Sequence, residues 1–450
     1  MESVHGFDFF RLKFDASGKL QEAQTFEELK QRANAAGATD AVLIAHGFRN
    51  DENDATGLYT RFLETFRQNL SRPELQPSLG SRKFIVAGIY WPSKAFKEAS
   101  GGDEGSVQGL DDGETVQKEL VREQLEELQA DEDLSPEQRE SLDRAIQLLD
   151  EVKGSDEAQD ELVDNVLSVL DGADIDATEG LDEIRAKPGS ELLAALRSPI
   201  ILSTAADEED DGGIAGVGAV FVPDEDGATQ GVGSFFGSIF GRIGQFLNLT
   251  TWYQMKNRSG IVGAKGVAQA VRDLKASRPG LKIHLVGHSL GGRLMAACVK
   301  SLATPKLQPD SVTLLQAAFS HYGFSPDNGH GKAGFFRAVM QDQVVRGPLV
   351  ATFSKLDTVV GKVYAVASRL AGDNTEAVGD ANDPFGGIGR NGSQKTEEAV
   401  KDFLHEVGQP YNFTTARVTN LDGSANLITS HGDVTNPRVT YAFASAVAQT

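Results

Sequence analysis

Residues 281–292 read LKIHLVGHSLGG, a strand-like run that ends in a serine flanked by glycines. Residues 281–286 have the pattern of a buried strand, and residues 293–302 have the pattern of a helix. Ser289 therefore stands at a sharp strand-to-helix turn, where larger residues than Gly287 and Gly291 would clash with the adjoining elements. Such a turn holds the serine in a strained backbone conformation, with its hydroxyl exposed near a helix N-terminus.

The chain on both sides of this turn alternates between strand and helix patterns. Upstream, we expect strands at residues 9–14, 41–45 and 84–90 and helices at residues 26–36 and 57–70. Downstream, we expect strands at residues 311–317, 349–353 and 413–419 and helices at residues 266–276, 333–343, 359–370, 396–405 and 438–448. Buried-strand composition in this order predicts an α/β fold with a mostly parallel central sheet and right-handed crossovers.

An acidic insertion interrupts the alternation. Residues 100–211 contain 34 acidic and 8 basic residues, in a chain whose formal net charge is -22. Amphipathic helical stripes within this segment predict a small bundle, and Ser135 and Pro136 open one of its helices well. We therefore expect an α/β core at residues 1–99 and 250–450, and a helical acidic cap at residues 100–249 that includes a glycine-rich connector at residues 203–234.

The segment at residues 235–247 has large apolar side chains at helical spacing. Three interpretations stay open for it: a helix packed on the core, a mobile lid over an apolar cleft, or a transient membrane-surface contact. No stretch approaches the ~20 apolar residues that span a bilayer. The N-terminus lacks the pattern of an export signal, so we expect a cytoplasmic protein.

Several classes of partner and cofactor are disfavoured by the composition. An acidic surface repels nucleic acid, so we expect no nucleic-acid partner. Cys298 is the only cysteine, which excludes an intrachain disulfide and a cysteine-based metal cluster, and we expect it to be a core thiol. The acidic run at residues 207–213 lacks the ligand spacing of an EF-hand loop. We expect neither a metal nor a cofactor.

A serine hydroxyl needs a base to remove its proton and a carboxylate to orient that base. Both should follow Ser289 on later strands. His431 lies in a loop between the last expected strand and the last helix, which makes it the candidate base. Asp357 comes just past the expected strand 349–353 and is the candidate acid, with Asp422 as its competitor.

Attack on a carbonyl also creates an oxyanion, which requires preorganised hydrogen-bond donors. The backbone N–H of Leu290, at the start of the helix, is one candidate donor. The N–H of Phe48 is the other, because it follows an early buried strand. In a competing interpretation, His46 and Gly47 only shape a turn.

Together these motifs resemble the α/β-hydrolase superfamily. The residues that carry the resemblance are Ile44-Ala45-His46-Gly47-Phe48, Gly287-His288-Ser289-Leu290-Gly291-Gly292, Asp357 and His431. Trp91-Pro92-Ser93, taken with the serine motif, is also similar to a poorly characterised bacterial branch with lipase- or esterase-like annotation. The resemblance implies hydrolysis of a small-molecule ester or lipid through an acyl-enzyme on Ser289. Two alternatives stay open: amide or thioester hydrolysis by the same residues, and a non-catalytic scaffold that binds a basic partner through the acidic insertion.

Overall fold

The structure is a computed structural model that describes residues 1–94, 112–197, 238–329, 331–372 and 384–450. The expected connector at residues 203–234, the acidic run at residues 207–213 and the start of the apolar segment at residues 235–237 lie outside these ranges.

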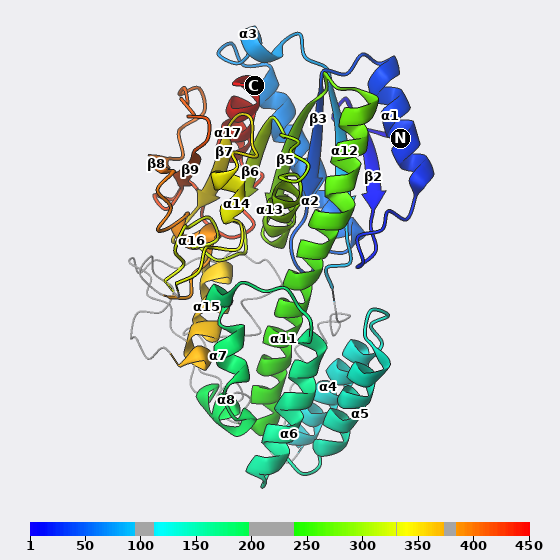
Figure 1. The fold of residues 1–450 in the computed structure, drawn as a ribbon, viewed down its shortest axis with the longest axis vertical. Coiled ribbons are helices and arrows are strands. Elements are labelled where there is room, and N and C mark those ends of the chain that lie inside the picture. Colours follow the sequence, from blue (N-terminus) through cyan, green and yellow to red (C-terminus); the bar gives the residue numbers. More distant parts are fainter. Residues whose placement is uncertain (95–111, 198–237, 330, 373–383) are drawn as a thin grey trace.

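A nine-stranded sheet forms the centre of the molecule, with the order β1-β2-β4-β3-β5-β6-β7-β9-β8 (Figure 1). The strands are β1 (Glu2–Val4), β2 (Phe7–Lys13), β3 (Asp40–Ala45), β4 (Phe84–Tyr90), β5 (Lys282–His288), β6 (Ser311–Leu315), β7 (Leu349–Phe353), β8 (Ala399–Phe403) and β9 (Val418–Asp422). Only β1 and β2 pair in antiparallel fashion, and every other neighbouring pair is parallel. The protein therefore has an α/β fold with a mostly parallel mixed sheet, as the sequence predicts.

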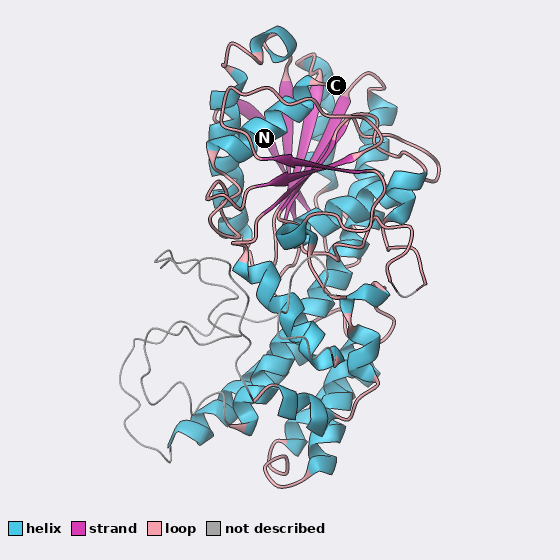
Figure 2. Cartoon of the chain, turned by 90° about the vertical axis from the view of Figure 1, so that its left-hand side faces the viewer, coloured by secondary structure: helices cyan, strands magenta, loops and turns pink. Residues whose placement is uncertain are grey.

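Helices cover both faces of the sheet (Figure 2). On one face α2 (Glu52–Leu70) and α17 (Pro437–Ala448) pack together, and the other face carries α1 (Ala23–Ala35), α12 (Ala268–Ser277) and α13 (Leu290–Ser301). The side chains of β3 alternate between the two cores, because successive residues of a strand point to opposite faces. The sheet is thus buried on both sides, which accounts for its apolar sequence.

The acidic insertion folds into helices beyond the carboxyl ends of the strands (Figure 1). These helices are α4 (Asp112–Gln129), α5 (Pro136–Leu148), α6 (Asp156–Leu167), α7 (Leu181–Arg185) and α8 (Gly189–Ala195). The expected cap of α5 is present, because Ser135 Oγ accepts from the Gln138 N–H at 3.2 Å and Gln138 Oε1 accepts from the Ser135 N–H at 2.9 Å.

One long helix connects the insertion to the sheet. α11 (Ile239–Ile261) continues through a π-helical turn (Val262–Val267) directly into α12, and the expected boundary at residue 250 falls inside it. Nearly all residues from 239 to 249 are buried. The described part of the apolar segment is therefore packed within a helix, and α11 as a whole contacts α4 and α13. No helix in the described ranges is both long and apolar enough to cross a membrane.

Two expected elements near the C-terminal end are wrong. Residues 396–405 contain strand β8 rather than a helix, and the last strand is β9 at Val418–Asp422 rather than residues 413–419. β8 is an edge strand with three of its five residues exposed, so its polar sequence lacks the signal of a buried strand. Backbone pairing with β9 determines its conformation instead. The remaining helices are α3 (Gln76–Leu79), α14 (Arg337–Gln341), α15 (Thr358–Ala371) and α16 (Ile388–Asn391).

Candidate active site

Ser289 lies between the end of β5 and the start of α13 with a backbone conformation that serine rarely adopts. Its φ is 57° and its ψ is -125°. A Cβ on Gly287 would overlap the carbonyl oxygen of Gly291, so the turn is as tight as the sequence motif predicts. The backbone hydrogen bonds that hold the strained conformation include those from the Ser289 N–H to Leu315 O (3.1 Å) and from the Ala318 N–H to Ser289 O (3.0 Å).

The loop after β3 approaches this serine closely. A Cβ on Gly47 would lie 2.7 Å from Ser289 Cβ, so only glycine fits there without displacement. Phe48 follows directly, and Leu290 is the first residue of α13. Within the described residues, neither the Phe48 nor the Leu290 backbone N–H has a hydrogen-bond partner. Two free N–H donors beside a serine are the arrangement that an oxyanion requires.

His431 pairs with Asp357. Its Nδ1 lies 2.8 Å from Asp357 Oδ2, while Asp357 Oδ1 accepts from the Val360 N–H at 2.9 Å. Asp357 is fully buried and caps the N-terminus of α15, where a carboxylate is favoured electrostatically. The competitor Asp422 instead accepts from the Ser424 N–H at 2.8 Å. With Nδ1 bonded to Asp357, Nε2 of His431 is the nitrogen left to exchange a proton.

Ser289 and His431 lie at the same edge of the sheet. His288, directly before the serine, has its ring centroid 4.6 Å from that of His431. The end of β6 connects the two, because Leu315 O accepts from the Ser289 N–H and the side chain of Gln316, the residue after β6, donates to the His431 carbonyl. Within the described structure Ser289 and His431 share no hydrogen bond, and catalytic hydrogen bonds often form fully only when substrate binds.

His46 anchors the Gly47–Phe48 loop to Trp91 and Tyr59. Its ring stacks on Trp91 with centroids 5.6 Å apart, and its carbonyl accepts from Trp91 Nε1 at 3.1 Å. Its backbone N–H donates to the Tyr59 hydroxyl at 2.9 Å. Burial lowers the pKa of His46 to about 4, so the ring is neutral at pH 7. The sequence identifies the loop, but Tyr59 and Trp91 as its supports come only from the fold.

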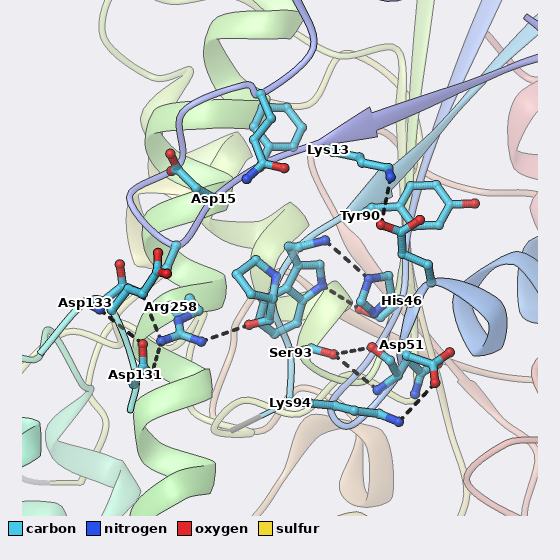
Figure 3. Close-up of a pocket in the computed structure, with 18 of the residues that line it drawn as sticks. Lys13, Asp15, His46, Asp51, Tyr90, Ser93, Lys94, Asp131, Asp133 and Arg258 are labelled. Carbon is cyan, nitrogen blue, oxygen red and sulfur yellow. Dashed lines mark hydrogen bonds and ion pairs between the residues drawn. The ribbon is translucent and has the colours of Figure 1, made fainter. Parts of the chain in front are cut away.

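A cavity of about 590 Å³ opens next to this loop, at the carboxyl ends of β2 and β4 (Figure 3). His46, Tyr90 and Trp91 form one wall, and Arg258 with the acidic residues 131–133 forms the other. Neither Ser289 nor His431 lines this cavity. The candidate active site is therefore defined by its side chains. The cavity lies beside it, between the sheet and the insertion.

Two other histidines that follow Ser289 in the sequence, and the single cysteine, have local structural roles. His321 is fully buried beside Asn391 (3.1 Å), and His405 stacks on Tyr411 with centroids 4.2 Å apart. His330 lies outside the described residues. Cys298 is buried, and burial raises the pKa of its thiol to about 12, which fits a core thiol.

Comparisons with protein-family models, curated proteins and solved structures found no match to this chain. Within the described residues, no group of three or more His, Cys, Asp or Glu side chains is placed to hold a metal ion.

Proposed function

We propose that this protein is a serine hydrolase with an α/β-hydrolase fold that cleaves carboxylic esters through an acyl-enzyme on Ser289. The observation that carries the proposal is the 2.8 Å bond between His431 and the buried Asp357 at the sheet edge that also holds the strained Ser289. The two unpartnered N–H groups of Phe48 and Leu290 support it further. A nucleophile, a base with its orienting acid, and oxyanion donors together are what acyl transfer requires.

In the proposed reaction, Ser289 Oγ attacks the ester carbonyl carbon while its proton passes to His431 Nε2. Asp357 fixes the Nδ1–H tautomer and stabilises the imidazolium that forms. The C–O bond to the alcohol then breaks, and His431 returns the proton to the departing oxygen. A water molecule repeats the sequence on the acyl-enzyme and releases the carboxylic acid. The Phe48 and Leu290 N–H groups face the oxyanion at both stages.

Labelling with a fluorophosphonate, followed by peptide mapping, tests the nucleophile directly. We expect the label on Ser289 in the native protein and none in Ser289→Ala, while Ser71→Ala, at an exposed serine that follows the C-terminal end of α2, labels normally. Native protein that stays unlabelled would favour the non-catalytic scaffold. Matched ester, thioester and amide substrates then identify the bond that is cleaved, and faster amide or thioester turnover would reassign the substrate class.

Aspartate-to-asparagine substitutions at residues 357 and 422 test which of the two aspartates is the acid. Asp357→Asn retains an amide oxygen for the Val360 N–H but loses the carboxylate that sets the His431 tautomer. We expect kcat to fall by about 10⁴-fold, the loss typical of this change in a catalytic triad. Asp422→Asn should stay near the native rate, and the reverse ranking in an ester assay would move the acid to Asp422.

A further inference from the structure

The backbone carbonyl of His431 is held by two side chains that the proposed mechanism does not use. His288 Nε2 and Gln316 Nε2 each lie 3.0 Å from this oxygen. A carbonyl oxygen has two lone pairs, so both of its acceptor positions are filled. We infer that His288 and Gln316 are positioning residues that fix His431 relative to Ser289, an inference that rests on the proposed function.

The hydrogen bond of His288 fixes its protonation state. A carbonyl can only accept, so His288 Nε2 carries the proton, and Nδ1 is left with a bare lone pair. That Nδ1 is enclosed and has no partner within the described residues. Desolvation holds the pKa of His288 well below its usual range, and the nearby His431 lowers it further. His288 therefore remains a neutral donor at pH 7.

Neutrality at this position matters because the two imidazole rings are neighbours. Their centroids are 4.6 Å apart and their planes are inclined by 42°. A positive charge on His288 would oppose the positive charge that His431 acquires when it takes the serine proton. A neutral His288 anchors the backbone of the base without opposing its protonation.

Gln316 connects the strand beside Ser289 to the loop of His431. It follows β6 directly, is fully buried, and has a φ of 39°, which is uncommon for a residue other than glycine. Its Nε2 donates to Ser430 O (2.8 Å) as well as to His431 O, and its backbone N–H donates to Thr352 O (3.2 Å). The strained backbone thus holds Gln316 so that its side-chain amide donates to the carbonyls of two successive residues, Ser430 and His431.

These contacts hold His431 at two ends. The carbonyl is fixed by His288 and Gln316, and the ring is fixed by Asp357 through Nδ1. With both ends held, the direction of Nε2 is determined by the fold. Because a displacement of about 1 Å in a catalytic group can cost about 100-fold in rate, loss of either donor should be measurable.

Three variants test the inference. Gln316→Met keeps a similar volume and removes the amide donor. His288→Leu removes the ring donor, whereas His288→Gln replaces it with an amide that can reach the same carbonyl. His405→Leu, at a histidine on the β8 side of the molecule, is the matched control. Thermal unfolding identifies variants that fail to fold. If Gln316→Met fails to fold, the comparison of His288→Leu with His288→Gln tests the inference.

Two readouts are taken on the full chain. In ester hydrolysis we expect kcat to fall about 10- to 100-fold in Gln316→Met and His288→Leu, KM to change less than about twofold, and His288→Gln to recover most of the rate. In ¹H NMR with ¹⁵N-labelled histidine, we expect the downfield Nδ1–H signal of the His431–Asp357 bond to broaden or disappear in the first two variants. It should persist in His288→Gln and in the control.

The NMR signal requires no substrate, so the two proposals can fail separately. If the native protein hydrolyses no ester and takes no label but the Nδ1–H signal still depends on both donors, the proposed function fails and the positioning stands. Native kcat together with an unchanged signal in both Gln316→Met and His288→Leu would overturn the inference.

Discussion

At the scale of single residues, the close approach of Gly47 to Ser289 sets the position of the Phe48 N–H. A methyl group at residue 47 would lie 2.7 Å from Ser289 Cβ, so Gly47→Ala must push the loop away from the serine. We expect kcat for ester hydrolysis to fall by about 10²- to 10³-fold, the loss typical of one oxyanion donor. Gly154→Ala is the control, because nothing lies within 4 Å of its added Cβ. Equal kcat in the two variants would contradict the role given to this loop.

His46 makes stability depend on pH in a defined window. Burial lowers its pKa to about 4 in the folded protein, against 6.5 when it is exposed. Between these values the unfolded chain binds the proton and the folded chain does not, so stability falls as pH decreases from about 6.5 to about 4. At pH 5 this group alone should cost about 2 kcal/mol relative to pH 7.

Urea unfolding at pH 7 and pH 5 isolates this effect by comparison with His46→Gln. The native protein should lose more free energy of unfolding between the two pH values than the variant does, because all other titrating groups are common to both. An identical loss in both proteins would show that the pKa of His46 does not differ between the folded and unfolded states.

The sequence identifies Ser289, Asp357 and His431 as candidates because each follows a strand and belongs to a residue type that acyl transfer needs. The sequence does not identify His288 or Gln316 as supports of His431. Their role depends on which carbonyl their side chains reach across the sheet edge, and a residue 115 positions away along the chain is invisible to local patterns.

At the scale of elements, a buried ion pair fastens the insertion to the core. Lys256 on α11 pairs with Glu179 of the 3₁₀ turn Ala177–Glu179, and its Nζ also donates to the Tyr364 hydroxyl on α15 at 2.7 Å. Glu179 in turn accepts from the Ser320 N–H at 2.9 Å. Both charged side chains are almost fully buried, so each depends on the other for compensation.

Lys256→Met should therefore destabilise the protein by about 3–5 kcal/mol, because it leaves the Glu179 carboxylate buried without its partner. Adding Glu179→Gln removes the unpaired charge but keeps an acceptor for Ser320, so the double variant should be more stable than Lys256→Met alone. The exposed pair Lys153–Glu114 provides the control, and Lys153→Met should change stability by less than about 1 kcal/mol. Thermal and urea unfolding measure the stability of each variant. A double variant less stable than Lys256→Met would show that the unpaired Glu179 charge is not the cause of the destabilisation.

Elements with a clear pattern could be predicted, and those without one could not. Strand β7 at Leu349–Phe353 matches its expected range, since it is a buried run that Gly347-Pro348 precedes and Ser354-Lys355 follows. The sequence predicts separate segments at residues 235–247 and 266–276 and does not predict the continuity of α11 with α12, a stretch that contains glycines at 241, 244, 260 and 263. Some of these glycines serve close packing: a Cβ on Gly263 would overlap the carbonyl of Leu294 on α13.

At the scale of the whole molecule, the distribution of charge should affect which substrates arrive. The sign of the field follows from composition alone, since residues 100–211 contain 34 acidic and 8 basic residues. Its position requires the fold, which brings Glu127 and the acidic residues 131–133 to the cavity next to His46 (Figure 3). These acidic residues of the insertion therefore lie beyond the carboxyl ends of the strands, the edge of the sheet that also carries the candidate active site.

Such a field should favour cationic over anionic esters during approach to the site. We expect kcat/KM at low ionic strength to rank a quaternary-ammonium ester above its neutral isostere and a succinate half-ester below it. Because salt screens fields of this kind over about 10 Å at 0.1 M and about 3 Å at 1 M, the three values should converge in 1 M NaCl. The neutral ester controls for direct effects of salt on the chemistry. A ranking that persists unchanged in 1 M NaCl would instead indicate direct contacts in the binding site, and the long-range field of the insertion would then have no part in selection.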